Sequence, residues 1–516
     1  MSTKKRAIIS VYDKTGIVEF AKSLQDKFNY EIVSTGGTYD ILKQNGVNVI
    51  EITELTGFRE LLRGRVKTLH PNIHAGILAM KSNESDIEEI IKNGISPVDM
   101  VVVNLYPFKD ASKKDFSQIE DLVEFVDIGG VTLLRAAAKN YFSVACVNSS
   151  TLYEKVLSNL AENNGEVALE LRKDLAIEAF AITSDYDSAI ANELIKRTSE
   201  KTEMPELFSF VAKKKQDLRY GENPHQSAAL YATENSLNYE VLNGKELSYN
   251  NIADMAAAMN IVTEFIDVPA VAVIKHGNPC GVALGETSYG AYLKAFDCDP
   301  ISAFGGIIGF NTTVNKQIAK HAASVFLEVL IAPAFDDEAL EILKAKKNLR
   351  LVTYNFSALE YRNAVKNTVK ALPFGTLVQS ADVVDLTKDN FNIATTHKPT
   401  AEQVEDMIFA WKVAKHVTSN AIVIAKGKKT IGIGAGQTSR IASMELALNQ
   451  ACDGTKDAVI ASDGFLPAVD NINAAAYARI GSIIQPGGSI KDREVIEQAE
   501  KDGISMVLTG VRHFKH

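Results

Sequence analysis

Short apolar runs alternate with amphipathic helical patterns through the first 200 residues, and few folds accommodate that alternation. Asp13 is placed to cap the first predicted helix, and Gly46 closes the second. Repeated strand–helix–strand patterns indicate an α/β fold with a parallel sheet covered by helices. The predicted strands are residues 6–12, 30–34, 48–52, 100–106 and 142–148, and the predicted helices include 14–28 and 39–46.

The later part of the chain mixes apolar runs with Ala-rich helical patterns. Because most of these runs are continuously apolar, the sheet that they form is expected to be buried on both faces. The pattern thins near residue 200, where we place a domain boundary, and a looser region at 335–400 separates two similar halves. The predicted strands are residues 270–276, 305–310, 420–426, 430–436 and 457–463.

Composition excludes several classes of protein. The 516 residues include 55 Lys+Arg and 64 Asp+Glu, and the formal charge of -9 argues against a dedicated binder of nucleic acid or of anionic membranes. The four cysteines are widely spaced and form no disulfide framework, which is typical of a reducing compartment. No apolar run approaches the roughly 18 residues of a membrane span, and no signal-peptide pattern is present. We therefore expect a cytoplasmic protein.

Two cofactor signatures fail on inspection. Gly434 and Gly436 follow an apolar run, but Ser439 stands where a dinucleotide-binding fingerprint needs its third glycine. In HGNPCG (276–281), Asn278 replaces the glutamate of the zinc deaminases, and Ala283 stands where the second thiolate of C-x-x-C belongs. The sequence therefore predicts no catalytic metal and no nicotinamide cofactor.

Polar clusters follow the apolar runs near the N-terminus. SVYDKTG (10–16) and STGGT (34–38) come at the carboxyl ends of predicted strands, and RGRVKTLHP (63–71) is rich in cations. Backbone N–H groups at such positions bind anions, and ligands of open α/β sheets lie at strand carboxyl ends. These clusters predict a phosphate pocket, although capping and turn formation would account for any one of them alone. In VDIGGVTLLRAAAKN (126–140), Asp127 is placed to cap a helix that carries Arg135 and Lys139 on one face.

Two polar clusters of the second part are candidates for chemistry. RYGENPHQ (219–226) groups Arg219 and Tyr220 in a loop before a strand. Lys275 and His276 directly follow the apolar run AVAVI, so a buried strand ends in a cation and an imidazole that titrates near neutrality. A catalytic pair and a satisfied structural histidine are both compatible with this pattern.

Ten motifs occur in an order that closely resembles one family. They are SVYDKTG, STGGT, ELTGFRELLRGRVKTLHPNIHAGIL, NLYPF, DIGGVTLLRAAAKN, RYGENPHQ, KHGNPCG, SNAIVIAK, IGIGAGQTSRI and GVRHFKH, and together they span residues 10–516. The chain resembles the bifunctional AICAR formyltransferase/IMP cyclohydrolase family of purine biosynthesis. The resemblance implies a methylglyoxal-synthase-like Rossmann-type domain over 1–198, and a transformylase region over 199–516 built from two cytidine-deaminase-like α/β subdomains. It also implies a homodimer with transformylase sites at the interface.

The resemblance also implies the roles of residues in formyl transfer from 10-formyltetrahydrofolate to the 5-amino group of AICAR. His276 would handle the amine proton, Lys275 would stabilise the transition state, and Asn420 would orient the formyl group. Glu328 stands where some relatives carry Asp. The implied nucleotide contacts are Arg219, Tyr220, His276, Gly305, Glu328, Asn420, Arg440 and Arg512, and the implied folate contacts are Ile441, Phe465, Asp470, Ser489 and Ile490.

For the cyclisation of formyl-AICAR to IMP, the resemblance implies a second set of residues. The implied catalytic residues are Lys139 first, then Lys67, with Tyr106 and Asp127. The implied nucleotide contacts are Tyr12, Asp13, Lys14, Ser34, Thr35, Gly36, Gly37, Arg65, Val66, Lys67, Thr68, Val103, Asn104, Asp127 and Gly129.

Two other functions remain open on the sequence. One is a methylglyoxal-synthase-like lyase fused to a metal-free deaminase relative, and the other is a nucleotide sensor without catalysis. The full set of candidate residues argues against a sensor, because a protein that only binds nucleotides does not need all of them.

Overall fold

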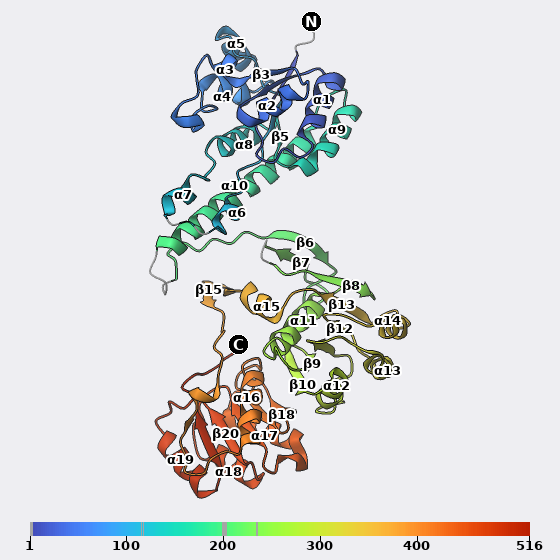
Figure 1. Ribbon diagram of the computed structural model, residues 1–516, viewed down its shortest axis with the longest axis vertical. Coiled ribbons are helices and arrows are strands. Elements are labelled where there is room, and N and C mark those ends of the chain that lie inside the picture. Colours follow the sequence, from blue (N-terminus) through green and yellow to red (C-terminus); the bar gives the residue numbers. More distant parts are fainter. Residues whose placement is uncertain (1–3, 115, 117, 199–203, 234–235) are drawn as a thin grey trace. The chain divides into compact units, whose positions relative to one another are not determined.

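The computed structural model (Figure 1) describes residues 4–114, 116, 118–198, 204–233 and 236–516. The chain separates into two compact units, Met1–Val211 and Ala212–His516. The boundary expected between 198 and 199 adjoins residues 199–203, which lie outside the described part of the chain. None of the described helices is both long and apolar enough to cross a membrane.

The described part of the first unit contains a five-stranded sheet in which every strand pair is parallel. The strand order is β3-β2-β1-β4-β5, which confirms the parallel sheet and the strands predicted from the apolar runs. The central strands are buried, because helices cover both faces of a sheet built this way. The strands are β1 (Lys5–Ile9), β2 (Tyr30–Ser34), β3 (Val49–Glu51), β4 (Met100–Val102) and β5 (Ala145–Val147).

Two helix starts in this unit differ from the prediction. Asp13 does not cap α1, because its Oδ1 accepts hydrogen bonds from the N–H (3.0 Å) and the hydroxyl (2.7 Å) of Thr15, and the helix begins after Gly16. The second helix begins at Gly36 rather than at 39, because Gly36 and Gly37 form a first turn that has no apolar side chains to detect. The helices are α1 (Ile17–Phe28), α2 (Gly36–Gln44), α3 (Ile52–Thr56), α4 (Pro71–Leu78), α5 (Glu84–Lys92), α6 (Phe108–Ser112), α7 (Ile119–Val123), α8 (Gly129–Lys139), α9 (Tyr153–Glu162) and α10 (Leu169–Thr198).

The described part of the second unit contains two six-stranded sheets with the same strand order. One runs β10-β9-β11-β12-β13-β8 and the other runs β18-β17-β19-β20-β21-β16, with matching parallel and antiparallel pairs. This confirms two similar halves, although the link between them is shorter than predicted, because β13 of the first sheet extends to Tyr354. The strands are β8 (Tyr239–Asn243), β9 (Ala270–Lys275), β10 (Asn278–Leu284), β11 (Ile307–Phe310), β12 (Val329–Ala332), β13 (Arg350–Tyr354), β16 (Asn392–Ile393), β17 (Ile422–Ala425), β18 (Thr430–Gly434), β19 (Val459–Ser462), β20 (Ser482–Gln485) and β21 (Ser505–Leu508).

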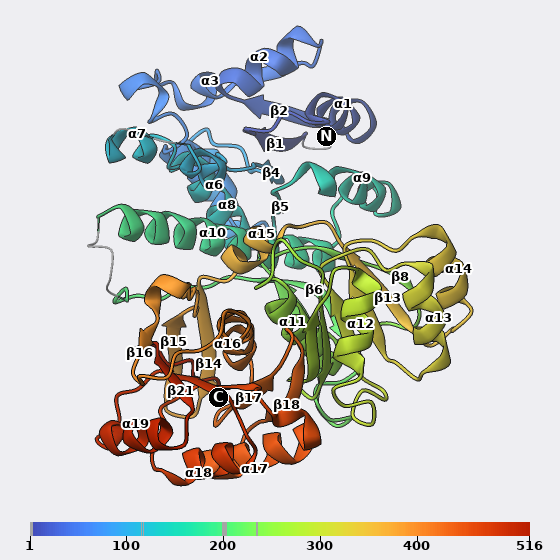
Figure 2. The ribbon, with the colours of Figure 1, turned by 60° about the horizontal axis from the view of Figure 1, so that its bottom comes forward.

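Two helices of equal length lie between these sheets (Figure 2). Each begins with a capping box, formed by Ser248 and Asn251 in α11 and by Thr400 and Gln403 in α16. Their apolar faces share one core, so the two halves are packed as one body. The α-helices are α11 (Tyr249–Val262), α12 (Ser288–Phe296), α13 (Lys316–Ser324), α14 (Asp337–Lys344), α15 (Ala358–Ala364), α16 (Ala401–Ala414), α17 (Arg440–Ala451), α18 (Asp470–Tyr477) and α19 (Asp492–Lys501). The described part of the unit also contains two antiparallel strand pairs, β6 (Lys213–Leu218) with β7 (Ala228–Ala232) and β14 (Asn367–Leu372) with β15 (Gly375–Ser380).

Candidate active sites

The parallel sheet of the first unit gathers the predicted polar clusters at one edge. Because β1, β2 and β4 run in the same direction, the loops that follow them meet at their carboxyl ends. Asn104 holds the loop after β1: its Oδ1 accepts the N–H groups of Tyr12 (2.5 Å) and Asp13 (2.9 Å), and its Nδ2 donates to the carbonyl of Asp13 (3.0 Å). The loop is thereby fixed to the neighbouring strand.

Two lysines bring positive charge to this edge. A Cβ atom on Gly36 would lie 3.1 Å from Nζ of Lys67, so the missing side chain lets the ammonium group approach the backbone. Lys14 donates to the carbonyl oxygens of Val11 and Tyr12. Burial and the charge of Lys67 lower the pKa of Lys14. Two cations held close together form a site suited to an anion such as a phosphate.

Asp127 stands at the start of α8 with its carboxylate held by backbone amides. Oδ1 accepts the N–H of Gly130 at 2.7 Å, Oδ2 accepts the N–H of Tyr106 at 3.4 Å, and its own N–H donates to the hydroxyl of Tyr186 at 2.9 Å. Burial raises the pKa of Asp127, while these hydrogen bonds and the charge of Lys67 oppose the rise. Asp127 is not the N-cap residue of α8, which is Ile128; it lies one residue earlier, and its carboxylate accepts an N–H group of the first turn, that of Gly130.

Lys139 lies apart from this group. It is the last residue of α8, ten residues beyond Gly129, and a helix rises about 1.5 Å per residue, so about 15 Å of helix axis separates them. Its side chain is exposed. Lys67 and Asp127 are near enough to influence each other electrostatically, whereas Lys139 stands at the opposite end of the helix. Its catalytic role remains a prediction from the resemblance.

The other predicted nucleotide contacts of this unit differ in their burial and in their partners. The hydroxyl of Ser34 is buried and donates to the carbonyl of Ile9 (2.7 Å), and exposed Arg65 is paired with Glu124. Gly129 lies against Thr68, because a Cβ atom there would be 2.8 Å from Oγ1 of Thr68. Of the remaining contacts, Thr35 is the N-cap residue of α2, Gly37 lies in the first turn of that helix, Val103 follows β4 and Val66 adjoins Lys67.

A small cavity beside Lys67 was not predicted from the sequence. Its volume is about 140 Å³. The stretch that lines it lies within ELTGFRELLRGRVKTLHP, but no spacing rule distinguished its apolar and aromatic residues from ordinary packing. Its walls are Thr56, Phe58, Arg59, Val66, Lys67, Leu69 and His70.

In the second unit, sheet register brings Lys275 and His276 next to other candidates. β9 pairs antiparallel with β11, and β11 pairs parallel with β12, so the carboxyl end of β9 shares an edge with the amino ends of β11 and β12. Gly305 and Glu328 lie at those amino ends. Nζ of Lys275 donates to the carbonyl of Phe304 at 2.8 Å, which holds the cation beside Gly305.

Glu328 already has a partner. One of its carboxylate oxygens lies 2.6 Å from Nη1 of Arg350, at the start of the next strand. A nucleotide contact by Glu328 therefore competes with this ion pair. Arg219 and Tyr220 lie in the loop between β6 and β7, where the guanidinium stacks 4.8 Å from the centre of the tyrosine ring.

The second sheet collects the remaining candidates at one edge. The amino end of β17 and the carboxyl ends of β18, β19, β20 and β21 coincide there, because β17 is antiparallel to its two neighbours. Asn420 is held by bonds from its Nδ2 to the carbonyl of Gln437 (2.8 Å) and from the hydroxyl of Ser443 to its own carbonyl (2.8 Å). The predicted residues around this edge are Asn420, Arg440, Ile441, Phe465, Asp470, Ser489, Ile490 and Arg512.

These residues differ in their availability to a ligand. Arg440 is buried and paired with the carboxylate of Asp463, so its guanidinium stabilises the site and is not exposed to a ligand. Phe465 and Ile490 expose their apolar side chains, and the guanidinium of Arg512 lies 4.7 Å from the ring centre of Phe514. The Asp470 carboxylate accepts from the neighbouring Asn471.

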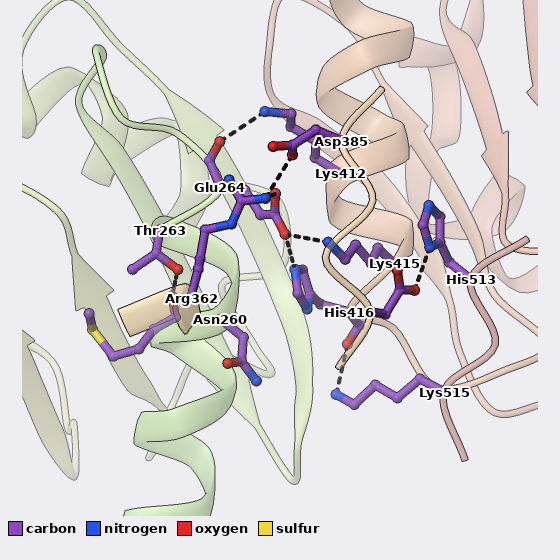
Figure 3. A network of polar contacts seen from close by, with 12 residues as sticks. Asn260, Thr263, Glu264, Arg362, Asp385, Lys412, Lys415, His416, His513 and Lys515 are labelled. Atoms are coloured by element: carbon purple, nitrogen blue, oxygen red, sulfur yellow. Dashed lines mark hydrogen bonds and ion pairs between the residues drawn. The ribbon is translucent and has the colours of Figure 1, made fainter. Parts of the chain in front are cut away.

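The two sheet edges are joined by contacts of the β9–β10 turn. Oδ1 of Asn278 accepts the N–H of Thr418 at 2.9 Å. Nζ of Lys515 donates to the carbonyls of His416 (2.9 Å; Figure 3) and Gly277 (3.3 Å). His276 of one half and Asn420 of the other are thereby held next to the same junction.

A buried ion cluster adjoins this junction through His416 (Figure 3). Glu264 accepts hydrogen bonds from Nζ of Lys415 (3.0 Å) and Nε2 of His416 (2.9 Å). Burial alone would raise the pKa of Glu264, but His416 and Lys415 outweigh it and lower the pKa to about 2. Among the described residues, no group of three or more His, Cys, Asp or Glu side chains is arranged to hold a metal ion.

Comparison with known proteins matches both units. The family described as MGS-like domain matches residues 16–132, and the family described as AICARFT/IMPCHase bienzyme matches residues 137–450. Proteins of Bacillus cereus (strain B4264) and Bacillus mycoides (strain KBAB4), both described as "Bifunctional purine biosynthesis protein PurH", are 48% identical to this chain over 99% of its length and 100% of theirs. A solved structure described as "Crystal structure of ForH" covers 37% of this chain and 100% of its own at 34% identity, with a TM-score of 0.34. The chain therefore belongs to the AICARFT/IMPCHase bienzyme family, the bifunctional AICAR formyltransferases and IMP cyclohydrolases of purine biosynthesis.

Proposed function

We propose that the second unit of this bifunctional enzyme transfers the formyl group of 10-formyltetrahydrofolate to AICAR and that the first unit closes the product to IMP. The observation that carries the proposal is the junction in the second unit, where the turn that bears His276 contacts the segment that bears Asn420. Neither the lyase nor the sensor is favoured, because the relatives are described as bifunctional biosynthetic proteins.

In formyl transfer, the 5-amino nitrogen of AICAR attacks the formyl carbon. The amine is a poor nucleophile, because its lone pair is delocalised into the ring. His276 takes the amine proton as the new N–C bond forms, and Lys275 stabilises the developing oxyanion while Asn420 orients the carbonyl. The bond from the formyl carbon to N10 of the folate then breaks, and N10 receives a proton, which yields tetrahydrofolate.

In cyclisation, the carboxamide nitrogen attacks the formyl carbon of the same molecule and water leaves. The reaction is intramolecular, so holding the two groups in contact supplies much of the acceleration. We assign proton transfer to Asp127, whose pKa is raised by burial, with Tyr106 beside it. Lys67 supports the oxyanion, and Lys14 binds the phosphate. This assignment prefers Lys67 to Lys139 as the group that stabilises the oxyanion. Nζ of Lys67 lies close to Gly36 at the start of α2, whereas Lys139 lies at the far end of α8.

The folate donor would bind at the second sheet edge. Exposed Phe465 and Ile490 offer apolar surface to the rings of the donor, and Arg440 holds the underlying loop through Asp463. We also propose a homodimer. The β14–β15 hairpin exposes Val369, Phe374 and Leu377, and burial of such side chains favours association. A cytoplasmic location is proposed because the four cysteines are free thiols.

A coupled assay tests the proposal. The chain is incubated with AICAR and 10-formyltetrahydrofolate, tetrahydrofolate is followed by absorbance, and the purine product is followed by chromatography. Formation of IMP is expected. Tetrahydrofolate without IMP would contradict the assignment of the first unit, and neither product from folded protein would support the sensor. Phosphate release from dihydroxyacetone phosphate would support the lyase.

A further inference from the structure

A carboxylate that no sequence motif singled out holds the turn that carries His276. Asp254 projects from α11, where Oδ1 accepts the N–H of Gly277 at 2.7 Å and Oδ2 accepts the N–H of His276 at 3.2 Å. His276 and Gly277 have φ values of 53° and 76°. The left-handed region is unfavourable for a residue with a side chain, so His276 needs such bonds to stay there.

A second residue, Lys515, hydrogen-bonds the same turn from the other half of the unit. Nζ of Lys515 donates to the carbonyl of Gly277, so the peptide units around the turn are bonded on both sides. Burial lowers the pKa of Lys515, and the nearby charge of Asp254 opposes that change. The catalytic candidates Lys275 and His276 therefore belong to a turn that is hydrogen-bonded both by the carboxylate of Asp254 and by the ammonium group of Lys515.

The other half of the unit has the same arrangement, a helix carboxylate that accepts two N–H groups of a turn, at a place where no candidate residue lies. Asp406 is the sixth residue of α16, as Asp254 is of α11. Its carboxylate accepts the N–H groups of Gly427 (2.8 Å) and Lys428 (2.6 Å), whose φ values are 63° and 55°. This turn follows the carboxyl end of β17, whereas Asn420 precedes its amino end. The fold thus supplies an internal control for the role of Asp254.

We propose that Asp254 is a positioning residue for formyl transfer, which fixes the His276–Gly277 turn so that His276 and Lys275 face the substrate together. The proposal rests on the roles proposed above for His276 and Lys275. Hydrogen bonds from two N–H groups to one carboxylate are stronger than neutral ones and define the orientation of the turn. An amide in place of the carboxylate turns an N–H₂ group toward one of these N–H groups and weakens the hold.

Asp254→Asn and the matched Asp406→Asn are compared in the full chain, with kcat and KM for formyl transfer, turnover of supplied formyl-AICAR, and Tm. Loss of an outer partner of a catalytic group costs about 10- to 100-fold, so we expect a kcat decrease of that size in Asp254→Asn with KM for AICAR within about threefold of the parent value. Asp406→Asn is expected to lower Tm as much and to keep kcat within about twofold. Asp254→Glu, which retains the carboxylate, is expected to give an intermediate kcat.

His276→Ala in the same series separates the two proposals. If His276→Ala is inactive in formyl transfer but Asp254→Asn and Asp406→Asn lose equal kcat, the positioning role is overturned while the catalytic role of His276 stands. If His276→Ala keeps its activity, the catalytic assignment fails and the positioning role fails with it. Formyl transfer is normalised to the folded fraction of each variant, taken from its unfolding curve at the assay temperature, because cyclohydrolase turnover reports on the first unit and not on the second. Where Asp254→Asn does not fold, equal losses of normalised kcat in Asp254→Glu and the matched Asp406→Glu overturn the proposal.

Discussion

Gly36→Ala tests whether the approach of Lys67 to the loop after β2 matters for cyclisation. Gly36 has φ +53°, and a side chain in this region costs about 1–2 kcal/mol, which lowers the Tm of a domain of this size by about 2–8 °C. The new Cβ atom would lie 3.1 Å from Nζ of Lys67, so the ammonium group must move by a few tenths of an ångström. A displacement of 1 Å at a catalytic group costs about 100-fold, so we expect about a tenfold loss in kcat/KM for formyl-AICAR.

Gly46→Ala is the matched control, because it carries the same backbone strain without the contact. Gly46 has φ +79° at the other end of α2, and its Cβ atom would meet nothing within 4 Å. The assay is cyclisation of supplied formyl-AICAR, with formyl transfer by the same preparation as the internal standard. Equal cyclohydrolase activity in the two variants would refute the argument, because the Gly46 variant lacks the contact with Lys67.

Three further predictions address the separation of the two activities and the buried ion cluster. His276→Ala is expected to abolish formyl transfer and to leave cyclisation of supplied formyl-AICAR nearly intact; loss of both activities in a folded variant would contradict two separate sites. A fragment ending at Val211 is expected to cyclise formyl-AICAR alone, since it comprises one compact unit, and a folded but inactive fragment would disprove this. The pKa of Glu264 is depressed from 4.5 to about 2, so its stabilising contribution is complete above pH 4.5 and is lost as pH falls toward 2. The contribution is about 3 kcal/mol. Tm measured against pH should fall more steeply over that window in the parent than in Glu264→Gln, and parallel curves would count against the ion cluster.

Local sequence patterns predicted the strands well. Each apolar run in the first unit contains a strand, because continuous burial in a parallel sheet requires apolar residues on both faces. Helix starts were predicted less well. Asp13 has the residue type of a cap, but its carboxylate bonds Thr15 instead, and the choice between these two local hydrogen bonds depends on the path of the surrounding loop.

Candidate residues at strand ends were also within reach of the sequence. Lys275 and His276 could be placed at an edge because AVAVI predicts a strand, and the polar clusters after β1 and β2 could be placed likewise. Asp254 could not be found in this way. It lies in the middle of an Ala- and Met-rich helix, where a single acid has the pattern of a solvated position, and its bonds to the turn involve residues more than 20 positions away.

The sequence by itself determined where the strands lie, which of their ends carry cations, amides and glycines, and to which family the motifs point, because periodicity and motif order are local or linear properties. Only the tertiary structure decided which ends meet. Lys515 reaches the carbonyl of Gly277 across 238 positions of sequence, and Asp254 reaches the same turn from α11. Those placements follow from strand register and from the core shared by α11 and α16, which no local pattern records.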